Sequence, residues 1–319
     1  MNTVWQYLKP TPAGSLIRRL VRTARRMNGL LPRKTMAINL RDRCSNSYHY
    51  WKHKRSLRAY IARERLLLRT ARVQQAAFYR APEHEPLVSV IIPTWNRGEL
   101  LAARTLPSVL AQTHRNLEII VVGDCCTDNT AELIAGLGDQ RVIFHNLPER
   151  GRYPSDKKAL WQVAGSAPKN KGLEMARGAW IAPLDDDDVF TPDHVVSLLQ
   201  FAQSNDLELV YGTLKIEEAA GKWKEKGQVT RQMSIQNSTM LFRSYIKLFA
   251  SDIHAWRFGL TVDYQRTIRY RETGVRIGYL NQVVALMPLR PGQTKMGILA
   301  DDRPGGAMGI KGSVAMVRQ

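Results

Sequence analysis

The sequence predicts an α/β domain built on a mostly parallel sheet and preceded by a basic, mainly helical extension. From residue 86 onward, short β-branched runs alternate with helical patterns, as they do in βαβ units. Positive charge is instead concentrated before residue 81. The chain has 319 residues, of which 44% are hydrophobic, so it can bury a sizeable core and wholesale disorder is excluded.

The expected elements of the α/β domain follow one another along residues 86–290. Strands are expected at 88–92, 117–122, 142–145 and 180–184, and helices at 99–111, 130–135, 172–176 and 265–272. Another helix is expected to begin near Pro192. Residues 301–319 have no clear periodic pattern, so residues 291–319 are expected to form a C-terminal tail.

The formal net charge of +19 is unevenly distributed. Residues 1–80 contain 19 Lys and Arg but only two acids, whereas residues 81–319 contain 28 basic and 26 acidic residues. The extension therefore carries a net charge of +17, and the domain only +2. Because net charge informs about partners rather than fold, the extension is expected to meet an anionic partner.

Residues 16–31 predict an amphipathic helix within this extension. Apolar residues recur at steps of three and four, and five arginines fall between them. Such a helix can lie on an anionic membrane surface, which is the partner expected through residues 1–80. The alternative is a helix docked on the domain with its arginines in solvent.

Residues 48–55 mix aromatic and basic side chains, a composition that suits single-stranded nucleic acid. No nucleic-acid motif accompanies them, so this partner is not favoured. A metal site of Cys44, His49 and His53 would lack a fourth ligand, and ordinary packed or exposed side chains are favoured there. Residues 55–79 predict a further helix. Its expected packing residues are Leu57, Ile61, Leu66, Leu67, Val73 and Phe78.

Several classes of protein are excluded. No run approaches the roughly 20 apolar residues that a membrane-spanning helix requires. Residues 1–11 lack the pattern of a signal peptide. Three cysteines, two of them adjacent, cannot form a disulfide framework. A cytoplasmic protein is expected, held at the inner face of the membrane if the extension binds lipid.

Polar clusters follow three of the expected strands. They comprise residues 93–97, 123–128 and 185–188. Ligands of parallel sheets bind at the carboxyl ends of the strands, so we expect these clusters to line one crevice.

These clusters carry a specific resemblance. The sequence VSVIIPTWNR at 88–97 is similar to the opening strand and loop of family 2 glycosyltransferases. The family's order continues over residues 86–290 with VVGD before Thr127 and Asp128, NKG and ARG at 170–178, and WIAPLDDDD before Pro192. The resemblance implies the GT-A fold, which is Rossmann-like with helices flanking the sheet, and transfer from a nucleoside-diphosphate sugar, with a UDP-sugar favoured. The implied acceptor is a hydroxyl of a saccharide or lipid-linked glycan.

Four consecutive aspartates, residues 185–188, repel one another, and a hard divalent cation would relieve that repulsion. The resemblance implies a DXD motif in which Asp187 is the main ligand of Mg²⁺ or Mn²⁺, Asp185 assists and Asp186 approaches the donor ribose. The cation would neutralise the departing diphosphate. The alternative is a polar loop whose last acid, Asp188, caps the following helix.

The resemblance also implies a nucleobase site. Pro93, Thr94 and Trp95 would meet the base, and Asp124 would bind its imino edge. Trp95 replaces a common tyrosine, and its alternative role is that of a buried core aromatic. Gly123 stands where the family often has aspartate, and Cys125-Cys126 replace a common Gly-Ser pair, so the base preference is left open.

Transfer requires a base that takes the proton of the acceptor hydroxyl. The resemblance implies Asp263 for this role, although Val262 replaces the glutamate that usually precedes it. A helix N-cap is the alternative role of Asp263, and Asp252 is the reserve candidate. The expected reaction is a metal-assisted, inverting displacement. The alternatives are a non-catalytic GT-A-like module that binds a membrane surface or a protein, and a nucleic-acid-binding protein.

Overall fold

The computed structural model describes residues 51–80, 85–229 and 233–293. The chain divides into two compact units, residues 1–58 and 59–319. The predicted amphipathic helix at 16–31, Cys44, His49 and residues 294–319 lie outside the described residues. Among the described residues, no helix is both long enough and apolar enough to cross a membrane.

Helix α3 (Arg58–Arg80) belongs almost entirely to the larger unit. Its buried stripe consists of Ile61, Glu64 and Leu68, spaced three and four residues apart. Burial is thus confirmed for Ile61, as it is for Leu57 just before the helix. The prediction of burial is wrong for the other four expected packing residues, whose side chains are exposed. They are Leu66, Leu67, Val73 and Phe78.

Ion pairs decide which face of α3 is inward. The Glu64 carboxylate is bound by the guanidinium of Arg269, and both side chains are buried. Farther along, Arg72 donates two hydrogen bonds of 2.6 Å to the carboxylate of Glu208. Buried acids must be paired, so these partners orient the helix more strongly than its leucines do.

The larger unit contains one mixed sheet, whose strands run in the order β3-β2-β1-β4-β8-β6-β9-β5, with β7 paired to β6. The strands are β1 (Val88–Thr94), β2 (Leu117–Gly123), β3 (Val142–Asn146), β4 (Trp180–Pro183), β5 (Val189–Phe190), β6 (Leu209–Ala219), β7 (Lys222–Lys226), β8 (Met240–Arg243) and β9 (Ile277–Met287). The half from β3 to β4 is parallel, as predicted. In the other half, β8 is antiparallel to both of its neighbours, and β6 runs parallel to β9.

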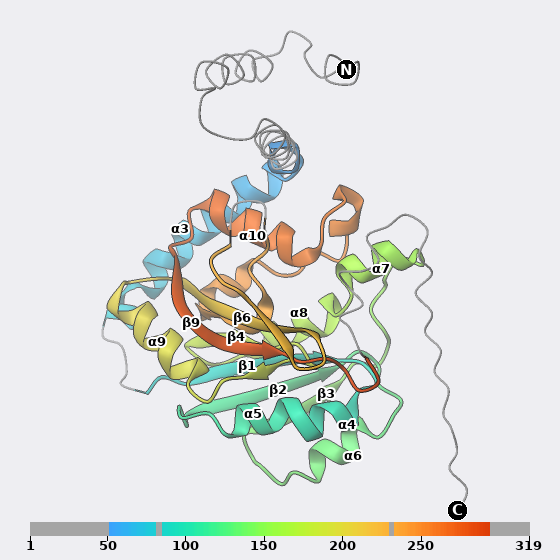
Figure 1. Ribbon diagram of the computed structural model, residues 1–319. Coiled ribbons are helices and arrows are strands. Elements are labelled where there is room, and N and C mark those ends of the chain that lie inside the picture. The colour runs from blue at the N-terminus through green and yellow to red at the C-terminus, as the bar shows by residue number, and fades with distance from the viewer. Residues whose placement is uncertain (1–50, 81–84, 230–232, 294–319) are drawn as a thin grey trace, which may run out of the picture. The chain divides into compact units, whose positions relative to one another are not determined.

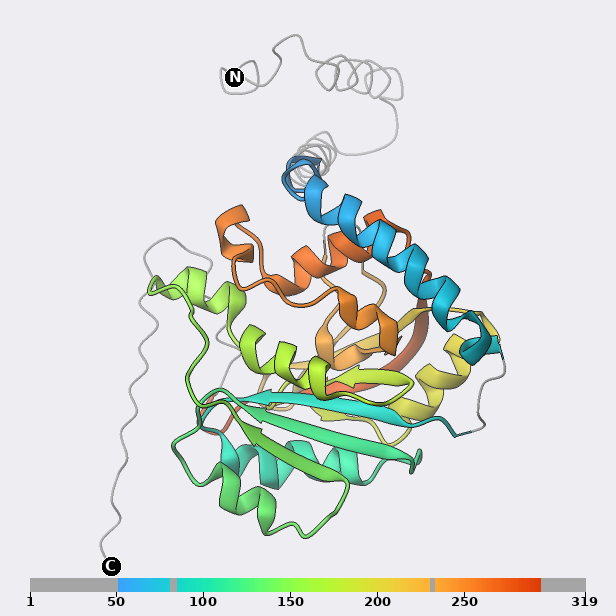
Figure 2. The same cartoon turned by 180° about the vertical axis from the view of Figure 1, so that it is seen from behind.

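Helices cover both faces of the sheet, as Figure 1 and, from behind, Figure 2 show. They are α4 (Gly98–Leu100), α5 (Leu106–Leu110), α6 (Thr130–Ala135), α7 (Lys157–Val163), α8 (Ser166–Met175), α9 (His194–Ser204) and α10 (Val262–Thr273). Short 3₁₀ turns are η3 (Asn237–Thr239), η4 (Ser244–Leu248) and η5 (Ala255–Phe258). Side chains of β1 alternate between two cores: Val90 and Ile92 pack with α5 and α9, and Ile91 with α3, α8 and α10.

The helix expected at 99–111 contains an irregularity that the sequence does not predict. A π-helical turn, η2 (Leu101–Thr105), joins α4 to α5. Such turns insert a residue into a helix and are frequent at functional sites. Here Arg104 and Thr105 both donate hydrogen bonds to backbone oxygens of the loop after β4.

Helix α8 is longer than the expected segment 172–176 and lies close to β1 and β2. Gly172 permits this approach, because a Cβ atom there would collide with the side chain of Ile91. The first turns of α8, which carry Lys169, are thereby fixed against the parallel half of the sheet.

Candidate functional site

The three polar clusters lie at one edge of the sheet, as predicted. Thr94 and Gly123, the last residues of β1 and β2, are paired in register, and Ile91 pairs with Pro183 of β4. The backbone N–H of Asp124 donates a 2.8 Å hydrogen bond to the carbonyl of Thr94. The loops after β1, β2 and β4 are therefore neighbours.

Two side chains hold Asp186, the second aspartate of the acidic loop, residues 185–188. Its carboxylate accepts hydrogen bonds from Thr94 Oγ1 at 2.8 Å and Arg97 Nη1 at 2.6 Å. Burial raises the pKa of Asp186, and the charge of Arg97 partly opposes that rise. Thr94, predicted to meet a nucleobase, thus directs its hydroxyl at the acidic loop.

Arginines surround Asp187. Its Oδ2 atom lies 2.5 Å from Arg290 Nε and 3.3 Å from Arg97 Nη1. Arg104 links the Asp187 carbonyl to that of Leu289, with hydrogen bonds of 2.8 and 2.9 Å. The segment after β9 is thereby fastened to the acidic loop.

Asp188 is buried and Asp185 is half-buried, and Ser238 contacts both residues. Ser238 Oγ donates to Asp188 Oδ2 at 2.5 Å and accepts from the Asp185 N–H at 3.1 Å. Within the described part of the chain, the other oxygen of Asp188 has no hydrogen-bond partner. Burial raises the pKa of both carboxyls, to about 6 for Asp185. The alternative role of Asp188 as a helix cap is wrong, because Asp193 is the N-cap residue of α9.

Asp263 lies in the first turn of α10 but does not cap it. Thr261 occupies the N-cap position, where its hydroxyl accepts from the Tyr264 N–H. Asp263 Oδ1 accepts a 3.0 Å hydrogen bond from Asn237 Nδ2 and lies 3.7 Å from Lys169 Nζ. The Asp263 charge raises the pKa of Asp185, and Lys169 lowers it, so these three groups share one electrostatic environment.

The reserve candidate, Asp252, belongs to a different cluster. Its Oδ2 atom accepts hydrogen bonds from Tyr60 Oη at 3.1 Å and Gln265 Nε2 at 2.8 Å. Its Oδ1 atom accepts from the N–H of His254. Asp252 therefore connects α3 with α10.

The expected nucleobase residues lie at the carboxyl ends of β1 and β2 and in the loops that follow them. Trp95 is 45% exposed, so its alternative role as a core aromatic is wrong. The Arg150 guanidinium carbon lies 3.4 Å from the centre of a Trp95 ring, and Arg150 Nε lies 3.9 Å from the buried Asp124 carboxylate. Asp124 Oδ1 also accepts from the N–H of Gly151 at 2.9 Å. Pro93 lies buried within β1.

Hydrogen bonds join the loops after β1 and β2. Asn96 Oδ1 accepts from the Thr127 N–H at 2.8 Å, and Asn146 Oδ1 accepts from the Cys126 N–H at 2.8 Å. Cys125 adopts a left-handed φ of 58°, which suits the glycine common at this position. A Cβ atom at position 123 would lie 2.5 Å from Asn146 Oδ1, so a larger residue than Gly123 would displace the Asn146 side chain.

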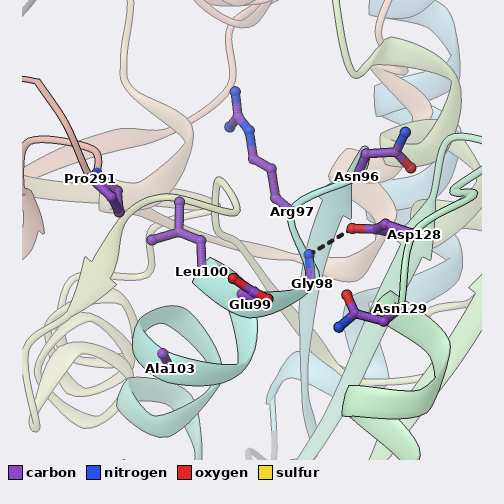
Figure 3. Close-up of a pocket in the computed structure, with 9 residues that line it drawn as sticks. All are labelled: Asn96, Arg97, Gly98, Glu99, Leu100, Ala103, Asp128, Asn129 and Pro291. Carbon is purple, nitrogen blue, oxygen red and sulfur yellow. Dashed lines mark hydrogen bonds between the residues drawn. The ribbon is translucent and has the colours of Figure 1, made fainter. Parts of the chain in front are cut away.

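An open pocket of about 600 Å³ adjoins these loops. It is lined by Asn96, Arg97, Gly98, Glu99, Leu100, Ala103, Asp128, Asn129 and Pro291. Figure 3 shows the hydrogen bond from the Gly98 N–H to the Asp128 carboxylate, with Pro291 across the pocket. Arg97 contributes to the pocket wall and also binds Asp186, so the pocket borders the acidic loop.

Comparison with known proteins identifies the family to which this chain belongs. The family described as Glycosyl transferase family 2 matches residues 89–259, more than half of the chain. The chain belongs to this family. Its match includes the loops after β1, β2 and β4 but ends just before Asp263.

Curated relatives of this family 2 protein include two bacterial examples. The poly(ribitol-phosphate) β-N-acetylglucosaminyltransferase TarP of Staphylococcus aureus is 30% identical over 175 residues, 52% of this chain and 49% of TarP. The succinoglycan biosynthesis protein ExoO of Rhizobium meliloti is 31% identical over 137 residues, 43% of this chain and 36% of ExoO. The chain spans half or less of the length of the curated relatives it matches.

The fold is that of GT-A glycosyltransferases. Residues 1–349 of S. aureus TarS, solved in complex with UDP-GlcNAc, superimpose with a TM-score of 0.52 at 18% identity, covering 65% of this chain and 60% of that one. The predicted fold class and family are thus confirmed.

The residues of the family 2 site fit a divalent cation by chemistry. In the described part of the chain, no three His, Cys, Asp or Glu side chains are gathered as a preformed metal site. However, the acidic loop offers hard oxygen donors, including the unpartnered Oδ1 of Asp188, and two cationic groups already contact Asp187 Oδ2.

The structure also brings residues to the site that the sequence did not single out. Arg104, Arg150 and Lys169 reach it from three separate segments. By contrast, Arg97 had a sequence signal, since it ends the family-like segment 88–97.

Proposed function

We propose that this protein is a glycosyltransferase that moves a sugar from a nucleoside-diphosphate sugar to an acceptor hydroxyl by inverting displacement. The observation that carries the proposal is the position of the acidic loop at one sheet edge, with Asp263 on one side and Trp95 and Asp124 on the other. The non-catalytic alternative is not favoured, because binding alone would not require a carboxylate beside the acidic loop.

The donor would bind on the Trp95 side. Trp95 offers an exposed stacking face, and Pro93 and Asp124 complete the proposed nucleobase site. A UDP-sugar is the favoured donor, which is supported by the UDP-GlcNAc complex of TarS. Arg150 covers the Trp95 ring, so it would have to move aside or stack on the base.

The acidic loop would hold Mg²⁺ or Mn²⁺ through Asp187 and Asp185, with Asp186 near the ribose. When bound, such a cation supplies charge neutralisation for the departing diphosphate. Arg97 and Arg290 both contact Asp187. Because guanidinium groups bind phosphate as well as carboxylate, these two arginines would also bind the departing diphosphate.

Asp263 would act as the base. Its side chain is 25% exposed, so an acceptor can reach it, and Asn237 fixes the carboxylate with a hydrogen bond to Oδ1. Asp263 would take the proton of the acceptor hydroxyl while the hydroxyl oxygen attacks the anomeric carbon. The bond to the diphosphate breaks on the opposite face, which inverts the configuration.

The acceptor is proposed to be a saccharide or a lipid-linked glycan at the cytoplasmic face of a membrane. Among the relatives, TarP is named for transfer to poly(ribitol-phosphate), and ExoO for succinoglycan biosynthesis. Residues 1–80 would contact the anionic membrane. On α3, Leu66 and Val73 are 66% and 79% exposed, arginines flank them, and the helix's single acid, Glu64, is buried.

The test measures transfer from radiolabelled sugar nucleotides in the presence of Mn²⁺. Asp263→Asn is expected to lower turnover by roughly 10²- to 10⁴-fold, as loss of a general base does. Asp187→Ala is expected to lower turnover and to abolish the dependence of the remaining turnover on Mn²⁺. The matched control is Asp139→Asn, at the amino end of β3, which should keep full turnover.

Unchanged turnover in either site variant would contradict the role assigned to that residue. Binding of UDP in the presence of Mn²⁺, without hydrolysis or transfer to any acceptor extract, would favour the non-catalytic alternative. Steeply salt-dependent binding of nucleic acid through residues 1–80 would favour the other alternative, a nucleic-acid-binding protein.

A further inference from the structure

Lys169 is a buried cation beside the proposed base. It lies in the second turn of α8 and is only 4% exposed. Its Nζ atom is 3.7 Å from Asp263 Oδ1, and its charge is the largest one that stabilises the ionised form of Asp185. Lysine is rarely buried unless it is paired, so these carboxylates account for its position.

The neighbouring lysine shows that this burial is specific. Lys171 lies two residues farther along α8, is partly exposed and pairs with Glu174 at 3.4 Å. Gly172 holds α8 close against β1, so Lys169 is presented from a fixed backbone. The helix therefore directs one lysine at the site and the other at solvent.

We propose that Lys169 is a positioning residue that holds the Asp263 carboxylate beside the acidic loop. This inference rests on the proposed function, in which Asp263 is the base. The charge of Asp263 disfavours the ionised form of Asp185, so the two carboxylates repel each other, and the side chain of Asp263 is partly exposed to solvent.

Two contacts oppose that repulsion. The ammonium of Lys169 attracts Asp263, and Asn237 donates to the same oxygen. Asn237 is in turn held by Arg266 Nη1, 3.3 Å from its Oδ1 atom. Without Lys169, the hydrogen bond from Asn237 must hold the carboxylate against its neighbours. The base then leaves the position at which it meets the acceptor.

The experiment uses the full chain with Mn²⁺ and measures nucleoside diphosphate release from UDP-N-acetylglucosamine, UDP-glucose, GDP-mannose and dTDP-glucose, with water as acceptor. Lys169→Met is expected to lower kcat about 10- to 100-fold and leave the donor KM within about threefold, since misplacement of a catalytic group has effects of this size. Lys169→Arg, which keeps the charge, should recover part of the loss. Lys171→Met is the matched control and should behave as wild type.

A double-mutant cycle separates positioning from a general loss of structure. If Lys169 acts through Asp263, Lys169→Met should change kcat less than about twofold in the Asp263→Asn background. Equal effects in both backgrounds, or an unchanged kcat in Lys169→Met, would overturn the inference. If wild type neither releases nucleoside diphosphate nor transfers sugar to any acceptor extract, or if Asp263→Asn is fully active, the proposed function is overturned instead. If Lys169→Met does not fold by circular dichroism, Lys169→Gln replaces it in the cycle.

Discussion

The Nε atom of Arg290 lies 2.5 Å from Oδ2 of Asp187, the carboxylate proposed as the main metal ligand. The guanidinium and a divalent cation would compete for this oxygen, whereas a diphosphate would attract them both. We therefore expect Arg290→Gln to bind Mn²⁺ alone up to about fivefold more tightly, because a partly exposed ion pair is worth about 1 kcal/mol or less. The same variant should bind UDP with Mn²⁺ more weakly.

Mn²⁺ binding is measured by the loss of the free-ion paramagnetic resonance signal, and UDP binding by calorimetry. Arg141→Gln removes a guanidinium of similar exposure that pairs with Asp139 before β3, so it serves as the control. Weaker Mn²⁺ binding by Arg290→Gln in the absence of nucleotide would show that Arg290 supports the cation site rather than competing with it.

The buried pair of Glu64 and Arg269 should be a major source of stability for the larger unit. Glu64→Gln leaves a buried guanidinium without its counter-charge, which costs about 3 kcal/mol of unfolding free energy. Glu174→Gln, which breaks an exposed pair with Lys171, should cost less than about 1 kcal/mol. Urea unfolding compares the two variants, and equal losses would contradict the prediction.

His194 should make stability depend on pH. Burial lowers its pKa to about 3, and the ring stacks on Phe190 while Nδ1 contacts the Val284 carbonyl. The unfolded chain takes up this proton below about pH 6.5, whereas the native state excludes it, so the histidine's contribution is lost as pH falls from 6.5 toward 3.

His194→Asn removes this titration and keeps an amide that can donate to Val284. The wild type is expected to be the more stable at pH 7.5, with its advantage shrinking by roughly 1 kcal/mol per pH unit below pH 6. Urea unfolding between pH 4.5 and 7.5 measures the difference. An advantage that does not change over this range would show that His194 takes up a proton in the native state.

The exposed face of α3 should contribute to membrane binding. Replacing Leu66 and Val73 together by serine removes the two most exposed large apolar side chains of the helix and should reduce sedimentation with vesicles containing anionic phosphatidylglycerol. Met233→Ser removes another exposed apolar side chain and should have no effect.

Deleting residues 1–50 removes 10 of the 19 basic residues of the extension but leaves α3 and its ion pairs in place. This deletion should also weaken vesicle binding, and added salt should weaken it further. If both altered proteins sediment as fully as the intact chain, the membrane assignment fails.

The sequence predicts the secondary structure of the parallel half of the sheet closely, because apolar runs and loop motifs are local signals. It does not predict which leucines of α3 are buried, since that depends on Arg269, some 200 residues away. Similarly, Asp263 is distinguished from a helix cap only once Thr261 is seen to cap α10.

Lys169 and Arg104 escaped prediction for another reason. Lys169 lies within the helical segment that contains the NKG sequence, and nothing local shows that it faces Asp263. Arg104 reaches the acidic loop from the π-helical turn, an irregularity that no residue pattern announces. Side chains that meet through tertiary packing carry no signal in sequence spacing.

The bond between Glu64 and Arg269 also has a mechanical consequence. Arg269 lies on α10, six residues after Asp263, and Figure 2 shows α3 beside that helix. Tyr60 adds a second link, since it binds Asp252, which Gln265 of α10 also binds. A force applied to α3 at a lipid surface would therefore be transmitted to α10, the helix that carries the proposed base. Binding of α3 to a membrane would in this way alter the alignment of Asp263.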